Sequence, residues 1–182
     1  MSRLVISFLL CFAYSAQAKV EPQALQWKEF RGITYQAGDL YIAGQPLSQA
    51  AMDHLKTAGV TDIVNLRTPE EMADRKSTPI EEEKLSASLN IAYHHLPSGG
   101  EKHPYSDDTV AAFAEVLDLA EGPVFLHCNS GRRAAHLWVA YLVRHQGMSL
   151  SDAVTLGKSA NFGAVPLEGY LAAPVYGSNQ PM

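Results

Sequence analysis

Short apolar stretches alternate with longer amphipathic stretches along most of this chain. Apolar and β-branched residues run together at 60–66, 91–96 and 124–127, and each run predicts a strand. Amphipathic runs with capping residues predict helices over 48–58, 78–89, 106–121 and 131–145, with a last helix that begins at Ser149. Strands that alternate with helices are typical of the α/β class. We therefore expect a central, mostly parallel sheet flanked by helices.

Turn and capping residues set the boundaries of these elements. Gly38 and Asp39 interrupt an alternating stretch over 33–43, which predicts a β-hairpin. Thr78 and Pro79 predict the start of a helix, because proline is favoured in a first helical turn. No element is predicted after Asn161, where Gly, Pro and Ala dominate. Serines precede the other amphipathic runs and are predicted N-caps: Ser48, Ser106 and Ser149.

The first 18 residues have the pattern of a secretory signal peptide. Arg3 precedes an apolar run, Leu4–Tyr14, that is too short to cross a bilayer. Ala16 and Ala18 form a small-residue cleavage site, so we expect cleavage after Ala18 and a single domain over 19–182. The sequence predicts a periplasmic or secreted protein with no stable membrane insertion once the signal peptide is removed.

Charge and cysteine content narrow the classes of function. The formal net charge is −5, and loss of the positive charge of Arg3 makes it −6, which argues against a nucleic-acid-binding protein. Cleavage also removes Cys11 and leaves Cys128 as the single cysteine, so no internal disulfide can form. His94 and His95 are adjacent on a predicted strand and point to opposite faces. Because no residues show zinc-ligand spacing either, we expect neither a metal nor an organic cofactor.

The segment His127–Arg133 joins a predicted strand to a predicted helix. A lone cysteine is often a small buried hydrophobe. At the N-terminus of a helix, however, free N–H groups and the helix dipole favour a thiolate, and the same N–H groups bind oxyanions. Gly131 lets the backbone curl around an anion, and an arginine in the first helical turn binds two oxygens at once. One loop thus offers a nucleophile, an anion cradle and a charge clamp.

This loop resembles the active-site loop of the cysteine-dependent phosphatases, in which five residues separate cysteine and arginine. Here four residues separate Cys128 from Arg133, and the position at which the longer loop has its arginine is occupied by Ala134. The hydroxyl residue that usually follows the arginine is also missing, because Ala134 follows Arg133. The shorter loop resembles the beta-lactamase-hydrolase-like, phosphatase-like domain family, which is similar in fold to dual-specificity phosphatases. Two upstream segments, Gly44-Gln45-Pro46 and Asn65-Leu66-Arg67, are similar as well. The resemblance covers about 35–160, the expected core of the domain.

The resemblance implies a hydrolase that acts on a phosphorylated protein or small molecule through a thiophosphate intermediate on Cys128. It implies that the phosphate oxygens bind to Arg133 and to the loop residues Asn129, Ser130, Gly131 and Arg132. Arg67 is expected near a strand end, where it contacts substrate or pairs with Glu70 or Glu71. A general acid is expected from the loop over 97–108, and Asp108 is taken as that acid among four candidates: Glu101, His103, Asp107 and Asp108.

Two other functions are compatible with the same loop. Rhodanese-type sulfurtransferases also separate cysteine and arginine by four residues, and their small loop suits a persulfide, which Cys128 would carry here. The closing Gly-Gly motif of those enzymes does not follow the helix in this chain. The other alternative is a module that binds an anion and performs no chemistry.

Overall fold

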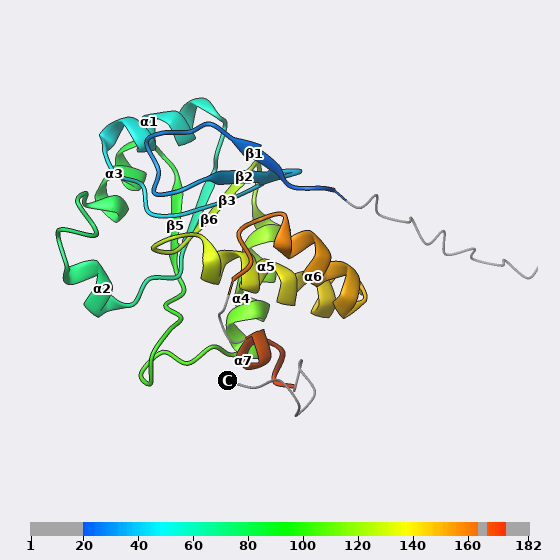
Figure 1. Ribbon diagram of the computed structural model, residues 1–182. Helices are drawn as coiled ribbons and strands as arrows, with labels where there is room; N and C mark the ends of the chain where they lie inside the picture. The colour runs from blue at the N-terminus through cyan, green and yellow to red at the C-terminus, as the bar shows by residue number, and fades with distance from the viewer. Residues whose placement is uncertain (1–19, 164–166, 174–182) are drawn as a thin grey trace, which may run out of the picture.

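A computed structural model describes residues 20–163 and 167–173, which form a six-stranded sheet covered by helices on both faces (Figure 1). The strand order is β1-β2-β3-β6-β4-β5, and the last four of these strands run parallel. The predicted α/β class with a mostly parallel sheet is confirmed. The strands are β1 Gln23–Leu25, β2 Thr34–Ala37, β3 Leu40–Ala43, β4 Asp62–Asn65, β5 Ala92–His95 and β6 Val124–His127.

The helices divide between the two faces of the sheet. Helices α1 and α3 lie on one face and α4 to α7 on the other, with α5 buried between its neighbours and the sheet (Figure 1). Side chains that alternate along the central strand serve both cores: Phe125 packs towards α1 and Leu126 towards α5. The described helices are α1 Gln49–Thr57, α2 Pro69–Ala73, α3 Glu82–Ser88, α4 Asp107–Leu119, α5 Arg132–Arg144, α6 Leu150–Lys158 and α7 Leu167–Leu171.

Local sequence signals explain most of the helix starts. The side chains of the predicted N-caps accept hydrogen bonds from backbone N–H groups three residues on, which satisfies donors that a helix start leaves unpaired. The predicted hairpin is also present, since β2 and β3 pair antiparallel around Gly38, whose φ is +63°. The three confirmed N-caps are Ser48, Ser106 and Ser149.

The helix predicted from Thr78 begins instead at Glu82. The hydroxyl of Thr78 is buried and donates to the carbonyl of Glu71, so it does not cap a helix. Three short elements were not predicted at all: β1, α2 and α7. Helix α2 begins with a capping box in which the side chains of Thr68 and Glu71 accept hydrogen bonds from one another's backbone N–H groups.

The parallel strands bring three chain segments to one edge of the sheet. His127 at the end of β6 lies in register with Ala43 of β3 and Asn65 of β4. The predicted loop at Cys128 therefore begins between the segments that follow β3 and β4. Within the two described ranges, no helix is both long and apolar enough to cross a membrane. The predicted signal peptide at 1–18 lies outside the described residues.

Candidate active site

The loop between β6 and α5 is held against the chain segment that follows β3. Ser130 pairs with Gly44 as an isolated antiparallel bridge, and the N–H of Gln45 donates to the carbonyl of Asn129 (3.1 Å). A side chain on Gly44 would lie 2.2 Å from the carbonyl oxygen of Arg31. Gly131 has a φ of +85° at the N-cap of α5. Glycine is therefore required at position 44 by the close approach of the Arg31 backbone, and is favoured at position 131 by the positive φ.

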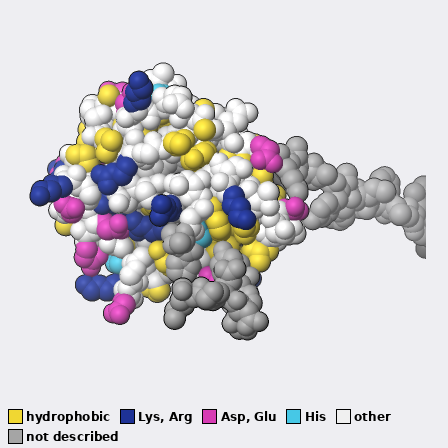
Figure 2. Space-filling model, viewed as in Figure 1, with side chains coloured by type: hydrophobic (Ala, Val, Ile, Leu, Met, Phe, Trp, Pro, Cys, Tyr) yellow, Lys and Arg dark blue, Asp and Glu magenta, His cyan; other side chains and the backbone are white. Residues whose placement is uncertain are grey.

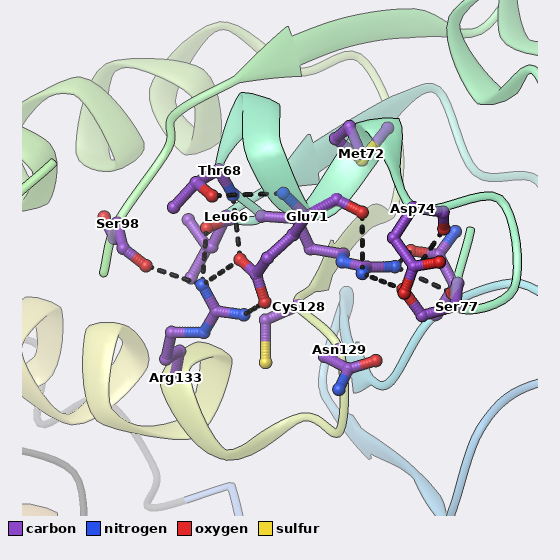
Figure 3. A network of polar contacts seen from close by, with 12 residues as sticks. Leu66, Thr68, Glu71, Met72, Asp74, Ser77, Ser98, Cys128, Asn129 and Arg133 are labelled. Carbon is purple, nitrogen blue, oxygen red and sulfur yellow. Dashed lines mark hydrogen bonds and ion pairs between the residues drawn. The ribbon is translucent and has the colours of Figure 1, made fainter. Parts of the chain in front are cut away.

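Cys128 is the first residue of this loop and is 1% exposed. Its side chain lies beside that of Arg133, which projects from the first turn of α5 (Figure 3). The thiol thus stands between the end of a central strand and the N-terminus of a 13-residue helix, where unpaired N–H groups favour an anion.

Arg133 is anchored by a carboxylate that the sequence pattern did not assign to it. Its Nη1 and Nη2 donate to the two carboxylate oxygens of Glu71, at 2.8 and 2.7 Å (Figure 3). Nη1 also donates to the carbonyls of Leu66 and Ser98, at 3.1 and 2.7 Å. Burial would lower the pKa of Arg133, but the hydrogen bonds to Glu71 and the charge of a Cys128 thiolate outweigh it and raise this pKa.

These contacts leave one edge of the guanidinium open. A guanidinium carries five N–H groups in a fixed plane. Within the described parts of the chain, Nε and the second N–H of Nη2 donate to no other residue, while Nη1 is fully occupied. The Nε–Nη2 edge can therefore bind two oxygens of one oxyanion while Glu71 holds the other edge.

Arg67 lies at the same end of the sheet but is closed to solvent, at 1% exposure. Its Nη1 donates to the side-chain oxygen of Gln45 and to the carbonyl of Ser77, both at 2.8 Å. Its Nη2 donates to the carbonyl of Glu71 and to the hydroxyl of Ser77. Burial lowers the pKa of Arg67. The structure gives Arg67 a supporting role under α2, and its predicted contact with substrate stays a prediction.

The other predicted binding residues lie on the outside of the loop. The side-chain oxygen of Asn129 accepts from Nη1 of Arg31 (2.5 Å), and the carbonyl of Ser130 accepts from Nδ2 of Asn161 (2.7 Å). Arg132 is exposed. On the face shown in Figure 2, Lys and Arg side chains are interspersed with Asp and Glu side chains, so this surface is mixed in charge.

The predicted general acids lie at the entrance to α4. Asp108 is exposed in its first turn, and Asp107 pairs with Arg144 at 3.3 Å. Glu101 is exposed and His103 half-buried on the preceding loop. None of these four side chains makes a hydrogen bond or ion pair with the Cys128 loop among the described residues. The role of Asp108 stays a prediction.

A phenol from the same loop does lie at the site. The Tyr105 ring packs against Tyr170 with ring centroids 5.0 Å apart, and a side chain on Gly99 would lie 3.8 Å from the Tyr105 hydroxyl and 3.2 Å from Nη1 of Arg133. Burial raises the pKa of Tyr105, as does the charge of a Cys128 thiolate, while Arg133 acts against both. The sequence pattern did not single out Tyr105, because carboxylates and histidine are the usual general acids at neutral pH.

No group of three or more His, Cys, Asp or Glu side chains able to hold a metal ion occurs within residues 20–163 and 167–173. The two adjacent histidines of β5 have different partners. Nε2 of His94 lies 2.8 Å from a carboxylate oxygen of Asp62, and Nε2 of His95 lies 2.6 Å from the carbonyl of Arg67. As expected for neighbours on a strand, they do not share one site.

Comparison with known proteins agrees with the motifs. Residues 30–143 match the family described as beta-lactamase hydrolase-like protein, phosphatase-like domain. A beta-lactamase hydrolase-like protein of Agrobacterium fabrum is 31% identical over 123 residues, which are 68% of this chain and only 28% of that protein. Dual specificity phosphatase 28 of Homo sapiens is 30% identical over 128 residues, 70% of this chain and 67% of that protein.

The fold is shared with solved phosphatase structures. TpbA of P. aeruginosa, solved in complex with pTyr, superposes with a TM-score of 0.60 at 17% identity, over 86% of this chain and 96% of that chain. The kinase associated phosphatase superposes with a TM-score of 0.61 at 17% identity, over 85% of this chain and 93% of that chain. The resemblance drawn from the Cys128 loop and the two upstream motifs is confirmed by the family match.

Proposed function

This chain belongs to the phosphatase-like domain family of the beta-lactamase hydrolase-like proteins, and from that membership we propose that it is a cysteine-dependent phosphatase that hydrolyses phosphoric monoesters. The observation that carries the proposal is the arrangement at Arg133. Glu71 fixes one edge of the guanidinium, and the open edge lies beside the Cys128 side chain, at the N-terminus of α5. The open guanidinium edge and the backbone N–H groups at the start of α5 are donors that suit the three terminal oxygens of a phosphoric monoester.

The reaction follows in two steps. The Cys128 sulfur attacks phosphorus, so that a sulfur–phosphorus bond forms while the bond to the leaving oxygen breaks and that oxygen takes up a proton. Backbone N–H groups of residues 129–133 and the open edge of Arg133 hold the equatorial oxygens. Water then attacks phosphorus, the sulfur–phosphorus bond breaks, and inorganic phosphate and the thiolate are released.

The first test is hydrolysis of p-nitrophenyl phosphate by residues 19–182 under reducing conditions. We expect activity in the wild type and its loss in Cys128→Ser and Arg133→Ala. Sulfur transfer from thiosulfate to cyanide is measured in parallel, because the spacing of Cys128 and Arg133 is also that of rhodanese-type enzymes. Thiocyanate formation without phosphate release would replace the proposal by sulfur transfer. If neither product forms, binding of inorganic phosphate tests the remaining alternative, an anion-binding module.

Asp108 is proposed as the general acid that protonates the leaving oxygen. Asp108→Asn should then slow hydrolysis of phenyl phosphate by about 100-fold and hydrolysis of p-nitrophenyl phosphate much less, since nitrophenolate needs no proton to leave. Asp107→Asn is the matched control, because that carboxylate pairs with Arg144. Equal rates for Asp108→Asn and wild type on both esters would contradict the role, and Tyr105→Phe would then be compared on the same two esters.

We also propose that the substrate is an aryl phosphate such as phosphotyrosine, as in the pTyr complex of the similarly folded TpbA. Hydrolysis of phosphotyrosine and phosphoserine peptides of one sequence tests this, with a preference for phosphotyrosine expected. A preference for phosphoserine would contradict it.

Export remains our proposal for residues 1–18, from the signal-peptide pattern in the sequence. Expression of the full chain in a Gram-negative bacterium should give a periplasmic protein whose intact mass corresponds to a start at Lys19. A cytoplasmic protein that retains these residues would contradict export.

A further inference from the structure

A buried carboxylate joins three strand ends immediately before the Cys128 loop. Glu82 is the first residue of α3 and is 1% exposed. Its Oε1 lies 2.7 Å from Nε2 of His127, at the end of β6. Its Oε2 accepts from the side-chain amides of Gln45, after β3, and Asn65, at the end of β4, at 3.2 and 3.4 Å. Residues from all three sequence motifs, Gly-Gln-Pro, Asn-Leu-Arg and His-Cys, therefore meet at Glu82.

The two ring nitrogens of His127 both face acceptors. Nε2 faces the Glu82 carboxylate, and Nδ1 lies 3.2 Å from the backbone carbonyl of Cys128, which can only accept. A neutral imidazole carries a single N–H. With an acceptor close to each nitrogen, the ring and the carboxylate together need one proton more than a neutral imidazole and a carboxylate carry. Nε2 and Oε1 stand at ion-pair distance, although the two atoms are not aligned as a hydrogen bond.

The surroundings favour a charged pair over two neutral groups. Arg67 and the carboxylate of Glu82 interact electrostatically, and Arg67 donates to Gln45, which donates to Glu82. Tyr93 also interacts electrostatically with Glu82, and its hydroxyl accepts from Asn65. The ring of Phe125 stacks on the His127 ring with centroids 5.3 Å apart. Amide donors and a nearby cation thus stabilise the carboxylate.

We infer that Glu82 is a positioning residue for the nucleophile: it holds His127 as an imidazolium whose Nδ1–H fixes the Cys128 carbonyl and whose charge stabilises the Cys128 thiolate. A cation on the residue next to a thiol favours the ionised form of that thiol, more strongly where water is excluded. The inference rests on the proposed function, because it concerns the thiolate that attacks phosphorus.

Thiolate formation is measured directly and without substrate. Cys128 is the single cysteine of residues 19–182, so the ultraviolet absorbance of the thiolate and the rate of alkylation by iodoacetamide both report on it. Glu82→Gln keeps the shape and hydrogen bonds of the side chain but removes its charge. Near neutral pH we expect about tenfold less thiolate and about tenfold slower alkylation in this variant, with the wild-type rate recovered at high pH. Glu83→Gln, an exposed neighbour on α3, is the matched control and should behave as wild type.

Two outcomes separate this inference from the proposed function. A wild type without phosphatase activity, together with a shifted alkylation profile in Glu82→Gln, would overturn the function and leave the role of Glu82 standing. An active wild type with identical profiles in Glu82→Gln, Glu83→Gln and wild type would overturn the role of Glu82 alone.

A second measurement needs no variant. In wild-type protein labelled with nitrogen-15 at histidine, His127 should show the shifts of an imidazolium, with both ring nitrogens protonated, throughout the neutral range. A spectrum in which one ring nitrogen of His127 carries no proton, with no short hydrogen bond from Glu82 to it, would overturn the inference even if Glu82→Gln failed to fold.

Discussion

Two arginines at the same end of the sheet have opposite surroundings. Arg67 is fully buried, and both of its terminal nitrogens donate to side chains and carbonyls of the protein. Arg133 is only partly buried, and a single carboxylate, that of Glu71, holds one edge and leaves another free. Both arginines carry the same charge, so the number of N–H groups left for a ligand is what separates the supporting role of Arg67 from the binding role that we propose for Arg133.

The comparison extends to the two acidic residues. Glu82 is buried among amides and His127, and Glu71 bridges the exposed helix α2 and Arg133. The cluster around Glu82 fixes the strand ends that lead into the loop. The pair of Glu71 and Arg133 sets the guanidinium edge that we propose binds the anion. The site thus has a closed structural side and an open chemical side, which separate variants can test.

The largest expected effect is on the closed side. Arg67→Met would leave the carbonyls of Ser77 and Glu71 and the side chain of Gln45 without their buried donor. We expect a loss of about 3 kcal/mol in the free energy of unfolding, measured by urea denaturation. Arg75→Met is the control, because Arg75 pairs with Glu81 at the surface. A stable Arg67→Met variant that fails to bind phosphate would reverse the assignment and make Arg67 a substrate ligand.

The next effect is on the open side. Arg133→Lys keeps a positive charge but cannot hold Glu71 and two phosphate oxygens in one plane. We expect kcat/KM for p-nitrophenyl phosphate to fall about 100-fold, with a smaller change in unfolding free energy than in Arg67→Met. Arg75→Lys, at an exposed ion pair, should keep wild-type kinetics. Wild-type kinetics in Arg133→Lys would show that charge alone suffices.

The sequence alone predicted the features set by neighbouring residues, but not the contacts between residues far apart in the chain. The N-caps and parallel strands could be predicted because local signals set them, as at Ser106, whose hydroxyl accepts from Thr109. The Cys128 loop could be predicted because its residues are consecutive. The partner of Arg133 could not, since Glu71 lies 62 residues away on a five-residue helix. The capping box at Thr68 was the available signal for that helix.

The remaining errors have the same origin. Thr78 resembles a helix start, but its hydroxyl bonds to the carbonyl of Glu71, a contact that exists only once the segment after β4 has folded back. Helix α7 follows residues rich in Gly, Pro and Ala, and buries Leu167, Tyr170 and Leu171 against the core. Both features depend on tertiary packing, which overrides local propensity.

The smallest expected effect concerns the pH dependence of the ion pair between Glu71 and Arg133. Burial opposes ionisation of Glu71, but its hydrogen bonds with Arg133 and the Thr68 N–H hold the pKa of Glu71 below its ordinary value. A carboxyl whose pKa is lowered by folding stabilises the protein above its unfolded pKa, and this contribution is lost as the pH falls through the folded value. At neutral pH, Glu71→Gln should therefore cost about 1 kcal/mol in unfolding free energy, a modest amount because the pair is partly exposed.

In acid, below the ordinary range for glutamate, the unfolding free energies of Glu71→Gln and wild type should converge, because wild-type Glu71 is then neutral as well. Urea denaturation at both pH values measures the difference. Glu70→Gln is the control: Glu70 is an exposed neighbour on α2 whose carboxylate pairs with the exposed Lys102. A gap between Glu71→Gln and wild type that stays constant from neutral to acid pH would mean that shape, and not the charge of Glu71, holds Arg133. The open edge would then survive loss of the carboxylate, and KM for p-nitrophenyl phosphate would stay unchanged in Glu71→Gln.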